Sequence, residues 1–272
     1  MLKTPLSVCL CSSFFLLPVG FARNKEKSNL DSHGLNSGNP AFNSNLLPKA
    51  PMNSMEMKFA QRYISRSNRN LVSIKHRSKI PFKIIDSVFN EQGLPVELKY
   101  LAVIESELKP SAKSHVGAMG PWQLMRPTAK ILGLNTSQRN DERRNYYKST
   151  TAAARYLKDL YAEFGDWLLV IAAYNGGPGP VYHAIKKSGS RNFWILQSYL
   201  PRETRQHVKK FIATQYYFEG QGSLTTLTKT ETAQYIEAVR TYSNKTCPPR
   251  QETSEEKFKR LMRESEQALM RK

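Results

Sequence analysis

Apolar residues recur at steps of three and four through most of residues 55–220, which is the periodicity of amphipathic helices. In the segment 145–164 the recurring positions are Ala152, Ala153, Tyr156, Leu157, Leu160 and Tyr161. The same pattern predicts further helices over residues 55–71, 81–93, 96–108, 122–132, 167–174, 181–187 and 203–218. No segment shows the clear period-two alternation of a half-buried strand. We therefore expect an all-α domain, with at most a minor sheet.

Residues with restricted backbones mark several helix ends. Pro95 begins the helix predicted over 96–108, and Pro110 ends it, because the residue before a proline avoids the helical region. Asp166 is a predicted N-cap for the segment 167–174, which is almost wholly apolar and must therefore be buried. The glycine- and proline-rich run 175–180 ends that helix.

The first 22 residues have the composition of a secretory signal peptide: a short positive region, an apolar core and a small-x-small end at Ala22. An uncleaved membrane anchor is the alternative, but the apolar stretch is short and Pro18 interrupts it. Residues 23–54 are rich in Asn, Ser, Pro and Gly and predict a flexible linker. We therefore expect an exported protein of the periplasm or cell envelope, in which residues 55–220 form the folded domain.

Cysteine usage limits the chemistry of the exported chain. Cleavage after Ala22 would remove Cys9 and Cys11, which lack the preceding small residue of a lipidation signal. Cys247 would remain alone, so no intramolecular disulfide is expected, and neither is a zinc or thiol-catalytic role. Residues 221–272 form a C-terminal extension that is partly helical, with a charged amphipathic helix predicted over 255–270.

The chain is strongly basic, with 41 Lys and Arg against 22 Asp and Glu and a net charge of +19. Such an excess favours a polyanionic partner, and nucleic acid, anionic lipid and an acidic wall polymer all qualify. The signal peptide and the lack of a recognisable binding module argue against nucleic acid.

Glu105 is the first candidate for chemistry. It lies on the apolar stripe that runs through Leu98, Leu101 and Leu108, whereas Glu107 lies on the opposite side of the predicted helix. A buried carboxylate is costly unless it is paired or protonated. Desolvation raises the pKa of a carboxyl group, which suits a general acid at neutral pH. By position alone, Glu105 is either such an acid or a structural glutamate in a salt bridge.

Two further segments carry polar groups among small residues. In 114–125 the glycines indicate close approach of the backbone to another helix or to a ligand. Trp122, Gln123 and Met125 either line a sugar cleft or form a packed corner of the core. Tyr174 and Asn175 end a buried helix, where they either position a carbohydrate or serve as a core residue and a helix cap.

Taken in order and spacing, the segments Ala102-Val103-Ile104-Glu105-Ser106, 117–123 and 173–175 resemble the lysozyme-like family 1 lytic transglycosylases. The resemblance is strongest to the membrane-bound lytic murein transglycosylase D branch. It covers roughly residues 55 to 220 and extends to the segments 93–95, 141–144, 149–153, 165–167 and 200–204. Members of that branch often carry C-terminal wall-binding modules, and none is recognisable here after Gly222.

The resemblance implies a lysozyme-like helical domain in which Glu105 is the lone catalytic acid and base. It places Ser106 in support of the site or of the glutamate, and Ser114 in contact with the substrate. The other implied cleft residues are Gln123 and Met125 along the saccharide, Tyr174 orienting Glu105 or the reacting sugar, Asn175 contacting the glycan, and Glu203 as a further carboxylate.

The resemblance also implies a reaction. It is cleavage of the β-1,4 bond between MurNAc and GlcNAc in peptidoglycan glycan strands, with formation of 1,6-anhydroMurNAc ends and without a metal or cofactor. We expect the basic surface to meet wall carboxylates or an anionic membrane. A goose-type lysozyme on the same fold, which would deliver water, and a non-catalytic wall-binding protein remain as alternatives.

Overall fold

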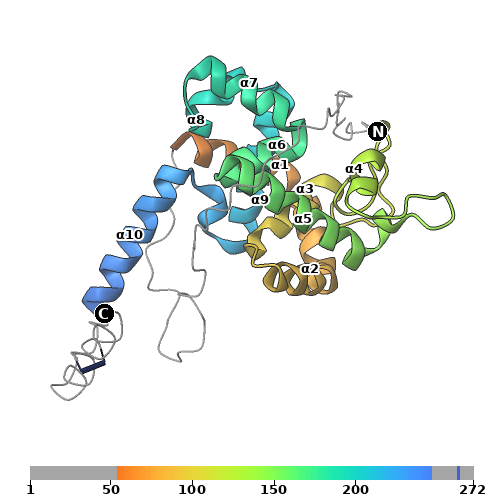
Figure 1. The fold of residues 1–272 in the computed structure, drawn as a ribbon, viewed down its shortest axis with the longest axis horizontal. Coiled ribbons are helices and arrows are strands. Elements are labelled where there is room, and N and C mark those ends of the chain that lie inside the picture. The colour runs from red at the N-terminus through yellow and green to blue at the C-terminus, as the bar shows by residue number, and fades with distance from the viewer. Residues whose placement is uncertain (1–53, 247–261, 264–272) are drawn as a thin grey trace, which may run out of the picture.

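The computed structural model describes residues 54–246 and 262–263, and the described chain is helical (Figure 1). Its α-helices are α1 (Ser54–Arg77), α2 (Lys79–Glu91), α3 (Tyr100–Ser106), α4 (Arg126–Ile131), α5 (Tyr146–Phe164), α6 (Trp167–Gly176), α7 (Pro178–Ser188), α8 (Phe193–Leu196), α9 (Arg202–Glu219) and α10 (Lys229–Thr246). Short 3₁₀ helices are η3 (Val96–Lys99), η4 (Glu142–Arg144), η5 (Gln197–Tyr199) and η6 (Leu224–Thr226). Strand pairing within the described residues is limited to isolated β-bridges. The predicted all-α fold is confirmed.

Helix α6 lies in the core, as its sequence predicts. Residues 168–173 are completely buried, and the helix packs against α5, α7 and α9. Asp166 caps its N-terminus, because one carboxylate oxygen accepts hydrogen bonds from the backbone N–H groups of Leu168 and Leu169 at 2.9 and 3.2 Å. The other oxygen accepts from the N–H of Lys229 at 2.7 Å, which connects the cap to the start of α10.

Helix α9 joins the parts of the molecule that carry the candidate site. It packs against α1, α3 and α6. A Cβ atom on Gly176 would lie only 2.7 Å from the hydroxyl oxygen of Thr204, so the end of α6 and the start of α9 are in close contact. This contact sets the position of Tyr174 and Asn175 relative to the first turn of α9.

The helix that includes Glu105 is shorter than predicted. The helix expected over 96–108 begins as η3 and ends at Ser106, because Glu107 and Leu108 adopt φ of 55° and 61°. Tertiary contacts hold this left-handed pair: Arg77 donates to the carbonyl of Glu107 at 3.0 Å, and the Tyr146 hydroxyl donates to that of Leu108. Such contacts lie far apart in sequence, so local pattern does not reveal them.

The helix expected over 122–132 is confined to α4. Gly120 has φ of 82° and Gln123 has φ of 46°, so the backbone turns sharply before Met125, which is extended. The helix expected over 55–71 continues to Arg77, α8 was not predicted, and α10 lies in the extension 221–272, which was predicted only to be partly helical. The four residues of α8 are too few for a helical period to show in the sequence, and α10 is largely polar.

Several predictions fall outside the described residues. They are the signal peptide, the linker up to residue 53, the cysteines, and the helix over 255–270 apart from residues 262–263. None of the described helices is long and apolar enough to cross a membrane.

Candidate active site

Glu105 lies in the last turn of α3, with its side chain only 9% exposed. The apolar stripe predicted around it is buried, since Leu98, Leu101 and Leu108 are all in the core. The carboxylate faces α9, where Nε2 of His207 lies 3.3 Å from Oε1 of Glu105. A buried acid and a buried imidazole therefore meet where α3 and α9 pack together.

His207 was missed by the sequence analysis. Its side chain is 10% exposed, and burial, with a smaller effect from the positive charge of Lys210, lowers the pKa of the imidazole to about 3. The imidazole is therefore neutral at neutral pH, and its contact with Glu105 is not an ion pair. A sequence signal was available: His207 lies four residues after Glu203, so the two share a face of α9.

Ser106 joins the end of α3 to the loop 111–125. Its buried hydroxyl lies 2.8 Å from the carbonyl oxygen of Pro121 and 3.1 Å from that of Ala102, and it accepts from the N–H of Lys109 at 3.2 Å. The hydroxyl is therefore directed at the backbone, which is a supporting position next to Glu105.

Tyr174 and Trp122 connect the same loop to α6. The Tyr174 hydroxyl donates to the backbone carbonyl of Trp122 at 2.7 Å, and its ring lies 5.5 Å from that of Tyr156. The Trp122 side chain is completely buried, packs against Phe89, and donates through Nε1 to the hydroxyl of Thr150 at 2.9 Å. Of the two interpretations of Trp122, the core residue is correct and the sugar-cleft residue is wrong.

The Gln123 side chain forms hydrogen bonds with the backbone of its own loop. Its amide nitrogen donates to the carbonyls of Gly120 at 2.8 Å and Ala112 at 3.2 Å, which leaves the amide oxygen as its acceptor for another group. The half-buried Ser114 hydroxyl accepts from the N–H of Ala118 at 2.9 Å. Met125 is half-buried at the N-cap of α4.

The remaining predicted residues come from α6 and α9. Asn175 is buried near the C-terminus of α6, and Glu203 is half-buried in the first turn of α9, one turn before His207. The packing of α6 on α9 at Gly176 and Thr204 places these helix ends next to one another. The structure thus brings residues from α3, α6, α9 and the loop 111–125 to one region.

A buried arginine holds the loop in place. Arg143, 2% exposed, donates through Nη1 to the carbonyls of Gly117 and Leu124, both at 2.9 Å. Its Nε and Nη2 donate to Asp141 at 2.9 and 2.7 Å, and these hydrogen bonds lower the pKa of the Asp141 carboxyl. Sequence reasoning noted the segment 141–144 without a role, and the structure identifies it as the support of residues 117–124.

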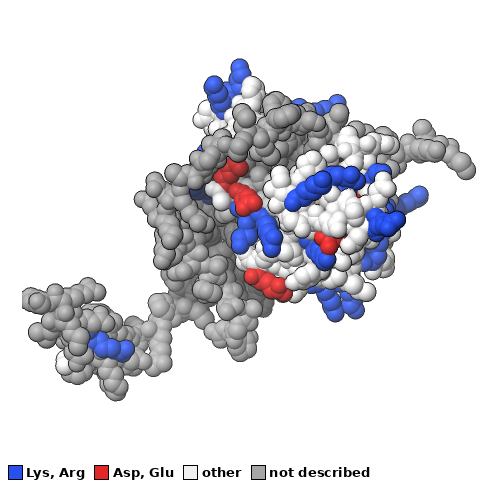
Figure 2. All heavy atoms as spheres, turned by 45° about the vertical axis from the view of Figure 1, so that its right-hand side comes forward, with Lys and Arg blue, Asp and Glu red and all other residues white. Residues whose placement is uncertain are grey.

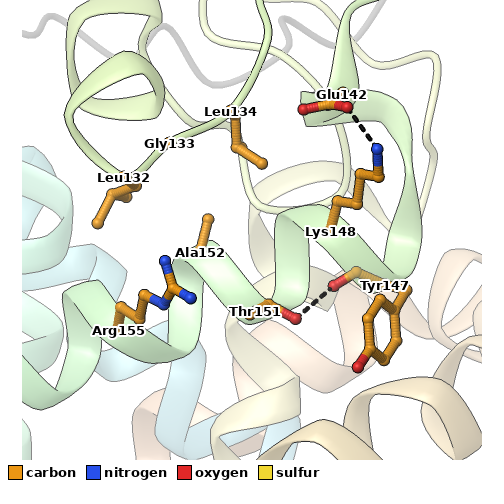
Figure 3. A pocket seen from close by; sticks show the side chains of 9 residues that line it. All are labelled: Leu132, Gly133, Leu134, Glu142, Tyr147, Lys148, Thr151, Ala152 and Arg155. Carbon is orange, nitrogen blue, oxygen red and sulfur yellow. Dashed lines mark hydrogen bonds and ion pairs between the residues drawn. The ribbon is translucent and has the colours of Figure 1, made fainter.

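A surface pocket of about 370 Å³ lies elsewhere, between the turn 132–134 and the outer face of α5 (Figure 3). Its acidic residue, Glu142, is paired with Lys148 at 2.5 Å across the rim. The lining contains none of the predicted site residues. A site for proton transfer is identified by titratable groups in an unusual environment, not by the volume of a cavity. We therefore assign the candidate active site to the buried Glu105–His207 pair.

The neutral His207 makes a prediction about stability. Its pKa is lower in the folded protein than the ordinary value of 6.5, so below pH 6.5 the unfolded chain binds a proton that the folded chain does not. The free energy of unfolding should therefore fall by about 1.4 kcal/mol per pH unit, or about 2 kcal/mol from pH 6.5 to pH 5. Urea unfolding of the protein and of His207→Gln across this range would measure it. Parallel curves for the two proteins would contradict the prediction.

Comparisons with known proteins find similar sequences among transglycosylases. Residues 86–197 match the protein family described as Transglycosylase SLT domain. Membrane-bound lytic murein transglycosylase D of Escherichia coli is 36% identical over 168 residues, which are 60% of this chain and 36% of that protein. Peptidoglycan transglycosylase gp16 of Escherichia phage T7 is 42% identical over 84 residues, 30% of this chain and 6% of the phage protein.

A solved structure of the 70-kDa soluble lytic transglycosylase, in complex with bulgecin A, has the same fold. The TM-score is 0.51 at 22% identity, over 67% of this chain and 33% of that one. The chain spans only about a third of the length of murein transglycosylase D, 36%. Glu105, Gln123 and Tyr174 all lie inside residues 86–197, the segment that is similar to the transglycosylase SLT domain family.

Proposed function

We propose that this protein is a lytic transglycosylase of peptidoglycan and that Glu105 is its single acid and base. The observation that carries the proposal is the position of the Glu105 carboxyl group within the transglycosylase SLT domain, nearly buried and facing the neutral imidazole of His207. A general acid needs a carboxyl group that can carry and return a proton, and a neutral neighbour permits both states. Names of similar proteins, including a lytic murein transglycosylase and a peptidoglycan transglycosylase, support the substrate class.

The proposed reaction has two proton transfers. Protonated Glu105 gives its proton to the glycosidic oxygen between MurNAc and GlcNAc while the bond from that oxygen to C1 of MurNAc breaks. The N-acetyl group of MurNAc stabilises the positive charge that develops at C1. Ionised Glu105 then removes the proton from the O6 hydroxyl of the same MurNAc, and O6 bonds to C1. The product is a 1,6-anhydroMurNAc end, and no water is consumed.

This path accounts for the use of one carboxyl group. Most glycoside hydrolases employ a pair of carboxylates that flank the scissile bond, one of which activates water or attacks the sugar. When O6 of the substrate is the nucleophile, Glu105 alone suffices. Glu203, in the first turn of α9, is then a cleft carboxylate that contacts the substrate.

The loop 111–125 and the end of α6 would bind the glycan. Ser114 accepts a hydrogen bond from Ala118, so its hydroxyl proton remains to be donated to a sugar oxygen. The Gln123 amide oxygen is able to accept from a sugar hydroxyl or N-acetyl N–H group. Met125 would line the apolar side of the cleft, and Asn175 would contact the glycan. Tyr174 would orient Glu105 or the reacting sugar, with its hydroxyl bonded to the carbonyl of Trp122.

In the cell, we propose that the protein is exported and takes part in cell-wall remodelling or turnover. Residues 1–22 would be the signal peptide, 23–54 the linker, 55–220 the catalytic domain and 221–272 an extension. On the face seen in Figure 2, Lys and Arg side chains spread over the described surface with a few acidic side chains between them. This basic surface suits the carboxylates of peptidoglycan or an anionic membrane.

The test is the mass of muropeptides released from purified sacculi by the purified protein. Products lighter by one water than the corresponding reducing-end muropeptides are expected, because ring closure by O6 replaces hydrolysis. Reducing-end products would instead identify a lysozyme on this fold. Binding to sacculi without any release would identify a wall-binding protein.

A further inference from the structure

We propose that His207 is the positioning residue for Glu105 and that its Nε2 atom accepts a hydrogen bond from the protonated carboxyl group and donates one to the ionised carboxylate. The inference rests on the proposed function, in which Glu105 is an acid in the first step and a base in the second. It assigns a role to a residue that lies in none of the motifs by which the sequence identified the site.

The geometry supports the inference first. Nε2 of His207 and Oε1 of Glu105 are 3.3 Å apart, and both side chains are about nine-tenths buried. They extend from α9 and α3, which pack directly against each other, and α9 is further held by α1 and α6. A side chain on so constrained a helix keeps its partner within a narrow range of positions, which proton transfer to a bound sugar requires.

The hydrogen bonding of Nε2 supports it second. In the structure Nε2 of His207 is buried and has no hydrogen-bond partner, although it lies 3.3 Å from Oε1 of Glu105. Buried polar atoms are almost always satisfied, so a buried exception that faces a reactive carboxyl group calls for a functional explanation. Hydrogen bonds within catalytic groups are often long without substrate and shorten when it binds.

The chemistry of neutral imidazole supports it third. A neutral histidine has one nitrogen that donates and one that accepts, and the two exchange roles when one water molecule takes the proton from the first nitrogen and another gives a proton to the second, so that the ring keeps a single proton. It can therefore serve both states of Glu105 in turn, whereas an ammonium or guanidinium group can only donate. Burial and Lys210, one turn away on α9, keep the pKa of His207 at about 3 and so maintain the neutral form.

The first arm of the test is kinetic. His207→Phe keeps a ring of similar size but removes both nitrogens, and should lower kcat by about 10²-fold with little change in KM. His207→Gln retains a donor and an acceptor, and should recover most of that loss. His183→Gln, at an exposed site on α7, is the matched histidine control and should behave as the unmodified protein.

Thermal unfolding of the same variants separates positioning from packing. An equal loss of kcat in His207→Phe and His207→Gln, accompanied by a lower Tm, would overturn the proposal in favour of a structural role. An unchanged kcat in His207→Phe would overturn it as well. Loss in the phenylalanine variant with recovery in the glutamine variant, at similar Tm, would support it.

The second arm is independent of activity. Imidazole ¹⁵N chemical shifts in the full chain, with the His207 signal assigned by its absence from His207→Gln, report charge and tautomer. His207 is expected to stay neutral over about pH 5–8 and to change its tautomer ratio in Glu105→Gln. The proposal would be overturned by a His207 signal that titrates within that range, or by a tautomer ratio that is the same in Glu105→Gln as in the unmodified protein. If the unmodified protein released no product, the proposed function would be overturned. The chemical shifts would still show whether His207 is hydrogen-bonded to Glu105.

Discussion

Replacing Glu105 with glutamine is expected to slow the release of muropeptides from sacculi by about 10²–10⁴-fold or more, while the protein stays folded. The amide has nearly the same shape as the carboxyl group, but it cannot give a proton to the glycosidic oxygen or take one from O6. Because Glu105 contacts neutral His207, the substitution leaves no opposite charge unpaired in that contact. Product release by mass spectrometry and thermal unfolding of the same preparation measure the two parts of the prediction.

Glu107→Gln is the matched control. Glu107 lies two residues further on, is 38% exposed, and forms ion pairs with Arg77 at 3.3 Å and Lys109 at 2.6 Å. Exposed ion pairs contribute little to stability, so this variant should retain both its fold and its rate of release. If Glu105→Gln kept full activity, Glu105 would not be the acid. If it unfolded, Glu105 would be the structural glutamate that its position in the sequence also allowed.

Gly120→Ala is expected to reduce the free energy of unfolding by about 2–5 kcal/mol and to abolish activity through the loop 111–125. A Cβ atom at this position would lie 1.8 Å from the carbonyl oxygen of Arg143 and 2.7 Å from its carbonyl carbon. Neither atom can move without displacing the arginine that holds Gly117 and Leu124. The φ of 82° adds a further cost for any residue with a side chain.

Gly117→Ala separates the two causes. Gly117 belongs to the same loop and has φ of 90°, but a Cβ atom there would meet nothing within 4 Å. The free energy of unfolding of Gly117→Ala should therefore fall by only about 1–2 kcal/mol, the cost of a left-handed backbone for alanine. Urea unfolding of both variants would measure the difference, and equal losses would show that contact with Arg143 is unimportant. With total stabilities of about 5–15 kcal/mol, the loss in Gly120→Ala is large enough to unfold part of the population.

The order of helices and the identity of the buried carboxyl group were accessible from sequence because both depend on local periodicity. The wholly apolar segment after Asp166 had to be buried, and the N-cap had to be Asp166, whatever surrounded them. Glu105 was recognisable because leucines three and four residues away must be buried with it. Its neighbourhood was recognisable only through the order of several motifs together.

The backbone course of the loop and the surroundings of Glu105 were decided by tertiary structure. Left-handed conformations at Glu107, Leu108 and Gln123 shortened two predicted helices, and they persist because distant groups such as Arg77 and Tyr146 bind the carbonyls they expose. Trp122 is buried by its contacts with Phe89 and Thr150, which no spacing in its own segment predicts.

His207 shows the same division most clearly. A single histidine in a helix of mixed polarity carries little signal of its role beyond its spacing of four from Glu203, and nothing in the sequence connects it to Glu105 on another helix. Local periodicity determined that α3 and α9 are helices and which of their faces turn inward. Only the packing of one helix on the other decided that a neutral imidazole faces the carboxyl group, because burial and charge around a side chain are properties of the whole fold.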